Sequence, residues 1–161
     1  MCGACGTKVD WAGPMVAGPL RRRDIGRCMT ALCPTVTVDV IPRGWMVKGR
    51  TGISRPAQTL DELCDALVPH VRLTGWDEME QVLLKVPAPV RVDTSKDDWT
   101  VPAGDPGVAE PVLGAVTHLP VHMKVAAFAL GARVFSSPAA LCVDTEPTHF
   151  LVARNGHLPR K

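Results

Sequence analysis

Apolar positions recur along this chain with two periods, one typical of helices and one typical of strands. Residues 20–32 show the helical period, with charged side chains on the opposite face, and Pro34 ends the segment. Residues 35–40 alternate between polar residues and valine, and a turn at 42–44 leads to a hairpin partner at 45–48. The first part of the chain is therefore expected to form a helix, a β-hairpin and a further helix.

Capping and turn signals predict this further helix and a second set of elements after it. Thr59 and Glu62 form a capping-box pattern at the start of a helix that ends near Pro69. A helix at 76–86 carries acidic residues in its first turn, where the helix dipole favours them. The remaining expected elements are a short strand at 90–92, a loop through 93–111, a helix from Pro120 to Leu130 capped by Gly131, and strands at 141–144 and 149–153.

These elements predict an α+β fold of two small units, in which a zinc knuckle and helix–hairpin–helix precede a smaller mixed unit. A chain of 161 residues, 46% hydrophobic and 21% charged, has the composition of an ordinary globular protein. No apolar run approaches the ~18 residues of a membrane span, and no secretion signal is evident, so we expect a cytoplasmic protein. The expected boundaries are 1–19 for the cysteine knuckle and arm, 20–72 for the basic unit and 74–161 for the second unit.

Positive charge is concentrated in the first half of the chain. Residues 16–57 carry eight Lys and Arg against two Asp, a net charge of +6, whereas residues 76–161 have a net charge of −2. Arginine pairs with phosphate and an indole can stack on a base, so an acidic polymer such as RNA is expected to contact the first half. Alternatively, the basic residues form a charged face in contact with water, and Trp45 is a core residue of the hairpin. The candidate contacts are Arg21, Arg22, Arg23, Arg43, Trp45, Lys48 and Arg50.

The six cysteines suggest metal binding more than disulfides, because cytosolic thiols are kept reduced. Cys2 and Cys5, each followed by glycine, have the spacing of a zinc knuckle, although they would also fit two free thiols. Cys28 and Cys33 are the candidates to complete a Cys₄ site for Zn²⁺. Cys28 also falls on the apolar side of its helix, where a buried structural thiol is common. Asp24, Cys64 or His70 could replace either of these two ligands.

Sequence motifs of the common enzyme classes are missing. The chain has no nucleophile elbow, phosphate loop, dinucleotide fingerprint or kinase signature, which favours a non-catalytic adaptor or regulator without a small-molecule substrate. One alternative is a DNA-binding transcriptional regulator that uses the helix at 21–32. Another is an enzyme with a site in the second unit around His118, His122 and Asp97.

Several of these segments together resemble a group of small actinobacterial proteins with a zinc-knuckle head. This group includes proteins that recruit the hibernation-promoting factor to the ribosome when zinc is scarce. The resemblance covers about residues 1–70 and implies a zinc-sensing adaptor that contacts the ribosome, its rRNA or a ribosome-binding protein. It also implies that Cys2 and Cys5 are sensor ligands and that residues 21–23 contact the partner. The matching segments are Met1-Cys2-Gly-Ala-Cys5-Gly6, Asp10-Trp11-Ala12, the arginine-rich helix, the Trp45 hairpin and Thr59-Leu-Asp-Glu-Leu63.

Overall fold

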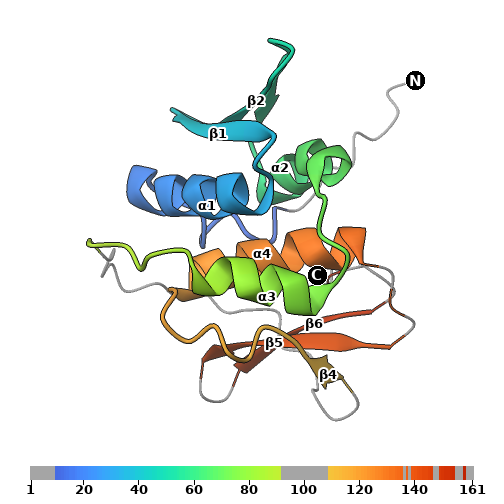
Figure 1. Ribbon diagram of the computed structural model, residues 1–161. Coiled ribbons are helices and arrows are strands. Elements are labelled where there is room, and N and C mark those ends of the chain that lie inside the picture. The colour runs from blue at the N-terminus through green and yellow to red at the C-terminus, as the bar shows by residue number, and fades with distance from the viewer. Residues whose placement is uncertain are drawn as a thin grey trace, which may run out of the picture.

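A computed structural model describes residues 10–91, 109–135, 137, 139–146, 149–154 and 158. In these residues the structure is mixed α+β, with helices and two small sheets (Figure 1), which confirms the α+β part of the expected fold. The expected zinc-knuckle cysteines, Cys2 and Cys5, lie outside the described residues. The elements are α1 (Pro19–Leu32), β1 (Val36–Ile41), β2 (Gly44–Gly49), β3 (Ser54–Ala57), α2 (Leu60–Leu67), the 3₁₀ turn η1 (Val68–His70), α3 (Trp76–Leu84), β4 (Glu110–Pro111), α4 (Val121–Val134), β5 (Leu141–Glu146) and β6 (His149–Ala153).

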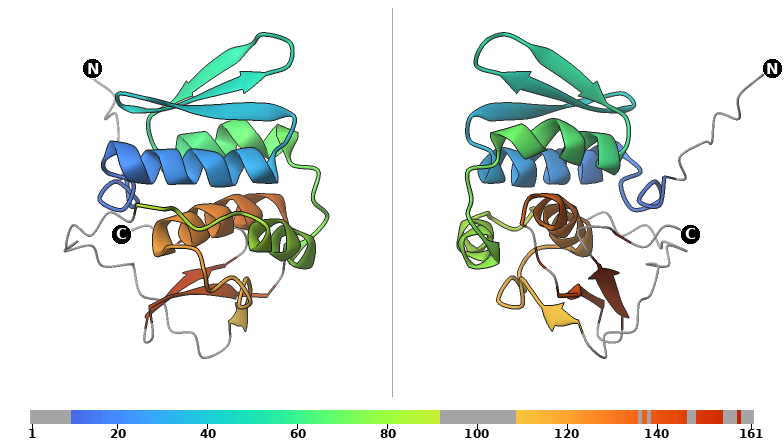
Figure 2. Two further views of the ribbon diagram at one scale, coloured as in Figure 1. Left: turned by 60° about the vertical axis from the view of Figure 1, so that its left-hand side comes forward. Right: turned by 90° about the vertical axis from the view of Figure 1, so that its right-hand side faces the viewer.

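The elements form four layers, sheet, helices, helices and sheet (Figure 2). Helices α1 and α2 pack against the antiparallel sheet β1-β2-β3. Helix α4 packs against β5 of the second sheet, whose order is β4-β5-β6, and its other side contacts α1 and α2. A single cluster of buried apolar residues runs through all these layers. The two expected units therefore share one core.

The expected hairpin is present, and glycine is required at its turn. Ile41 pairs with Gly44 across the two-residue turn. Gly44 has φ +136°, and a Cβ at this position would collide with the Ala57 carbonyl oxygen of β3. The turn therefore also fixes how closely β3 approaches β2. The sequence pattern did not reveal β3, because only one of its four residues, Ala57, is a buried apolar residue.

The start of α2 matches the expected cap. The Thr59 hydroxyl accepts a hydrogen bond from the Glu62 N–H at 3.1 Å. The Glu62 carboxylate in turn accepts from the Gln58 N–H at 2.8 Å, one residue earlier than a capping box places this bond. The first bond satisfies a backbone N–H that the first turn of a helix leaves open, and the second holds Gln58, which precedes the cap, against the helix start.

Helix α4 is the central helix, buried from His122 to Ala132, and it extends beyond its expected end. Gly131 was expected to cap it, but the helix continues to Val134. The reason for glycine here is close packing, since a Cβ on Gly131 would lie 2.5 Å from the Trp76 ring. That ring packs against Phe128 and Phe135, with centroid distances of 5.5 and 5.3 Å.

Two other expectations in the second unit need correction. The strand expected at 90–92 does not form at residues 90 and 91, which are exposed bends. Within the expected loop 93–111, Glu110 and Pro111 form the short strand β4, parallel to β5. Residues 93–108 lie outside the described part of the chain. The strands expected at 141–144 and 149–153 are present as β5 and β6.

Candidate binding groove

A groove with a volume of about 920 Å³ runs between helix α1 and strand β1. Its walls are mainly apolar, with two arginines on the helix side and one aspartate on the strand side. The lining residues are Pro19, Leu20, Arg23, Arg27, Thr30, Ala31, Val38, Asp39 and Val40.

The charge of the groove is positive. Arg23 and Arg27 are exposed and lie one helical turn apart, so they project from the same side of α1. The Asp39 carboxylate is already engaged by the Lys48 ammonium group at 2.7 Å. The two guanidinium groups therefore offer their donors to a ligand in the groove, and an acidic group is the matching chemistry.

The outer edge of β1, which borders this groove, is partly closed by the chain itself. The Val36 N–H donates to the Cys33 carbonyl oxygen at 3.1 Å, and the Val38 N–H donates to the Thr30 hydroxyl at 3.2 Å. Helix α1 comes close at Gly26, where a Cβ would lie 3.0 Å from the Val38 carbonyl oxygen. Val40, at the open end of the groove, is 37% exposed.

The other residues expected to contact nucleic acid lie partly in the core and partly on the surface. Trp45 is fully buried and its indole N–H donates to the Arg22 carbonyl oxygen at 2.8 Å, so its ring is not a stacking surface. Arg21 is only 6% exposed, and it donates to the Met15 carbonyl oxygen. Arg22 donates to the Pro42 carbonyl oxygen, and Lys48 contacts Asp39. Arg23, Arg43 and Arg50 are exposed.

A buried polar contact joins α1 to α4 beneath the groove helix. His122 Nε2 donates to Asp24 Oδ2 at 3.0 Å, and the two side chains are 9% and 2% exposed. The second oxygen of Asp24, Oδ1, is buried and has no hydrogen-bond partner among the described residues. The contact spans 98 positions in the sequence, and no local pattern signals it.

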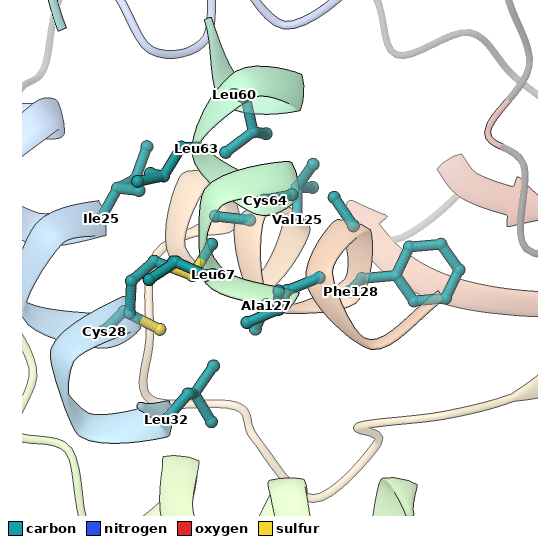
Figure 3. Close-up of a cluster of buried hydrophobic side chains, with 14 of the residues drawn as sticks. Ile25, Cys28, Leu32, Leu60, Leu63, Cys64, Leu67, Val125, Ala127 and Phe128 are labelled. Atoms are coloured by element: carbon teal, nitrogen blue, oxygen red, sulfur yellow. The ribbon is translucent and has the colours of Figure 1, made fainter. Parts of the chain in front are cut away.

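Cys28 and Cys33 lie in the apolar core. Figure 3 shows Cys28 and Cys64 among the apolar side chains between α1, α2 and α4. Burial raises the pKa of Cys28 to about 12 and that of Cys33 to about 11, so both remain neutral thiols near neutral pH. The Cys28 thiol donates weakly to the Met123 carbonyl oxygen at 3.9 Å. A metal ligand must be a thiolate, so this setting favours structural thiols.

Among the described residues, no three His, Cys, Asp or Glu side chains form a group that could hold a metal ion. The alternative ligands lie in separate surroundings, Asp24 against His122 and Cys64 in the core, where burial raises its pKa to about 12. Cys2 and Cys5 lie outside the described part of the chain.

The arm that follows the cysteine pair packs on the core from residue 10 onward. The Trp11 indole N–H donates to the Asp61 carboxylate at 3.2 Å, and Arg133 donates to the same oxygen at 2.6 Å. Arg133 also donates to Asp65 at 3.1 Å, which ties the arm to both α2 and α4. Ala12, Met15 and Val16 are buried. Sequence reasoning missed this cluster, whose one local signal is an indole beside short apolar residues.

The histidines of the alternative enzyme site do not come together. His118 Nε2 lies 2.7 Å from the Val86 carbonyl oxygen, whereas His122 contacts Asp24. Asp97, the third candidate, lies outside the described residues.

Comparison with protein-family models, curated proteins and solved structures found no match for the chain. None of the helices in the described residues combines the length and apolar character needed to cross a lipid bilayer.

Proposed function

We propose that this protein is a non-catalytic, zinc-binding adaptor that holds an acidic segment of a partner protein in the α1–β1 groove. The observation that carries the proposal is the pairing of Arg23 and Arg27 above an apolar groove wall. Charge attracts an acidic segment to this site, and the apolar wall gives it area to bury.

A protein partner fits the groove better than RNA does. Binding of single-stranded RNA relies on aromatic side chains that stack on bases. The described aromatic side chains are buried or packed against the core, Trp45 and Phe128 completely. A ribosome-binding protein is therefore a better candidate than rRNA, and RNA binding through the exposed Arg43 and Arg50 is the competing outcome.

Reversing the groove charge is expected to weaken partner binding about ten-fold or more, because each arginine then repels the acidic segment. The probe is a peptide selected by the wild-type protein from a random 12-residue library, with its affinity measured by fluorescence anisotropy. Selection is expected to enrich sequences that combine acidic and apolar residues. The variant is Arg23→Glu/Arg27→Glu, and the matched control is Arg43→Glu/Arg50→Glu, which changes the same charge outside the groove.

If both variants lose the same peptide affinity, binding depends on general charge attraction, and the groove is not the binding site. Absence of any enriched peptide would have the same consequence. If ribosomal RNA binds more tightly than any peptide, and the Arg43→Glu/Arg50→Glu variant loses that binding, the RNA alternative takes its place.

The zinc part of the proposal rests on the Cys2-x2-Cys5-Gly6 spacing. Protein purified without added zinc is expected to hold about one zinc per chain, lost in Cys2→Ser/Cys5→Ser, as measured by mass spectrometry of the metal. Cys142→Ser serves as the matched control, since this buried thiol lies in the second sheet. Because Cys28 lies in the apolar core with its thiol directed at the Met123 carbonyl oxygen, Cys28→Ala is expected to retain the metal. Zinc-free wild-type protein would refute the zinc assignment and leave the groove proposal standing.

A further inference from the structure

A helix followed by a β-hairpin occurs twice in the described part of the chain. Helix α1 with β1 and β2 forms one copy, and α4 with β5 and β6 forms the other (Figure 1). Both helices have 14 residues, and two residues separate the strands of each hairpin. Residues 38–47 (VDVIPRGWMV) and 143–152 (VDTEPTHFLV) are identical at four positions, all at a spacing of 105. The two copies can therefore be compared position by position.

The pairing of the strands shows which edge positions correspond. Val38 pairs with Val47 in the first copy, and Cys142 pairs with Val152 in the second. Val47 and Val152 are equivalent by the spacing of 105, so Val38 and Cys142 are equivalent too. The offset between β1 and β5 is one residue shorter here because the β5–β6 pairing shifts register between Asp144 and Glu146. The identities Val38/Val143 and Asp39/Asp144 are therefore one residue out of step with the strand pairing, and the equivalence of the two edges follows from the pairing.

In the second copy, the chain covers the outer edge of this strand. β4 lies beside β5 and runs parallel to it (Figure 2). The Glu110 N–H donates to the Ala140 carbonyl oxygen at 2.8 Å, and the Val112 N–H donates to the Cys142 carbonyl oxygen at 2.9 Å. Leu113, which follows, is 2% exposed. An extended segment with an acidic residue and apolar neighbours thus fills this flank of the second copy.

In the first copy, the corresponding flank is the α1–β1 groove. Among the described residues no strand pairs with the outer edge of β1, which is the first strand of its sheet. The groove extends along α1 from Pro19 to Ala31, about 18 Å of helix. This length accommodates an extended segment of about five or six residues.

We propose that the partner segment lies in this groove as a strand parallel to β1, in the position that β4 has beside β5. The inference rests on the proposed function and specifies the conformation and direction of its ligand. Arg23 and Arg27 then bind acidic side chains along one side of the segment. Leu20 and Val40 contact its apolar side chains.

Thr30 makes this arrangement testable. Its hydroxyl occupies the Val38 N–H, the group that a strand beside β1 would bond. The Cys33 carbonyl oxygen occupies the Val36 N–H in the same way, and Gly26 of α1 lies close to the Val38 carbonyl oxygen. Segment binding therefore exchanges two internal hydrogen bonds for bonds to the segment and shifts α1 away from Val38. Thr30→Val removes the competing hydroxyl while keeping the shape of the side chain, so the variant is expected to bind the segment about three-fold more tightly.

The decisive probe is the peptide acetyl-VEVEVE-amide and two of its derivatives, one N-methylated at every valine and one at every glutamate. In a strand, alternate N–H groups point toward the neighbouring strand. One derivative is therefore expected to lose at least about ten-fold in affinity and the other to stay within about two-fold. For a parallel segment, a spin label that replaces the N-terminal acetyl group of the peptide broadens the Val36 amide signal more than that of Ile41.

Equal effects of the two methylation patterns would refute strand binding, and stronger broadening at Ile41 would refute the parallel direction. Binding of the unmodified peptide that still depends on Arg23 and Arg27 would in those cases uphold the proposed function. Failure of the wild-type protein to bind the unmodified peptide would refute the strand inference, while the library selection decides on the groove separately.

Discussion

Replacing Trp45 by alanine is expected to lower the free energy of unfolding by about 3 to 5 kcal/mol. The ring is fully buried between the first sheet and α1, and a Cβ at Gly26 of that helix would lie 3.7 Å from it. The substitution leaves a cavity and also removes the hydrogen bond to the Arg22 carbonyl oxygen. Because whole domains are stable by only about 5 to 15 kcal/mol, urea unfolding at 25 °C should show a large shift of the midpoint.

Trp45→Phe separates the packing from the hydrogen bond. It keeps most of the ring volume and lacks the indole N–H, so a loss of about 1 to 2 kcal/mol is expected, with the Arg22 carbonyl left unpaired. Groove binding should remain in the folded fraction of both variants. A Trp45→Ala protein of normal stability that no longer bound its ligand would instead place the ring at the binding surface and contradict the structure.

The sequence was sufficient for the main helices and for the hairpins because each has a clear period. Thr59 and Glu62 marked the start of α2 correctly because capping is a local interaction. Gly131 was misassigned because glycine signals both a helix end and a close contact. Only the position of Trp76, contributed by α3, distinguishes the two.

The sequence alone indicates no internal repeat, and the similar order of elements in the two helix–hairpin segments is evident only from the structure. Residues 38–47 and 143–152 share four identities at ten positions, and the strand pairing does not align two of them, Val38/Val143 and Asp39/Asp144. The short strand β4 offers only two residues of pattern. Both became visible from backbone pairing, which is a property of the fold.

Part of the candidate site followed from the sequence and part did not. Arg23 and Arg27 stand four residues apart on a helix, so a shared face could be expected from α1 alone. The groove needs β1 beside that face, and strand position is set by tertiary packing. From the sequence, Trp45 could be either a core residue or a surface residue. In the structure the side chains of β2 alternate between two sides, and Trp45 lies with Val47 on the buried side.

The contact between Asp24 and His122 is expected to contribute less than Trp45 to the free energy of unfolding. Asp24→Ala removes the hydrogen bond between these two buried side chains, and the loss of a buried hydrogen bond to a charged group costs about 1.5 to 3 kcal/mol. The matched control is Asp39→Ala, which breaks the half-exposed contact with Lys48 and should cost less than about 1 kcal/mol. Urea unfolding of both variants measures the difference.

The double variant Asp24→Leu/His122→Leu tests what the contact does. Asp24 Oδ1 is buried without a hydrogen-bond partner among the described residues, so the carboxylate is incompletely compensated. Apolar side chains avoid that cost, and the double variant is expected to be more stable than Asp24→Ala. The contact would then serve mainly to set how α1, which carries Arg23 and Arg27, sits on α4. Weaker peptide binding by a fully folded double variant would support this role, whereas unchanged binding would mean that apolar packing alone positions the groove helix.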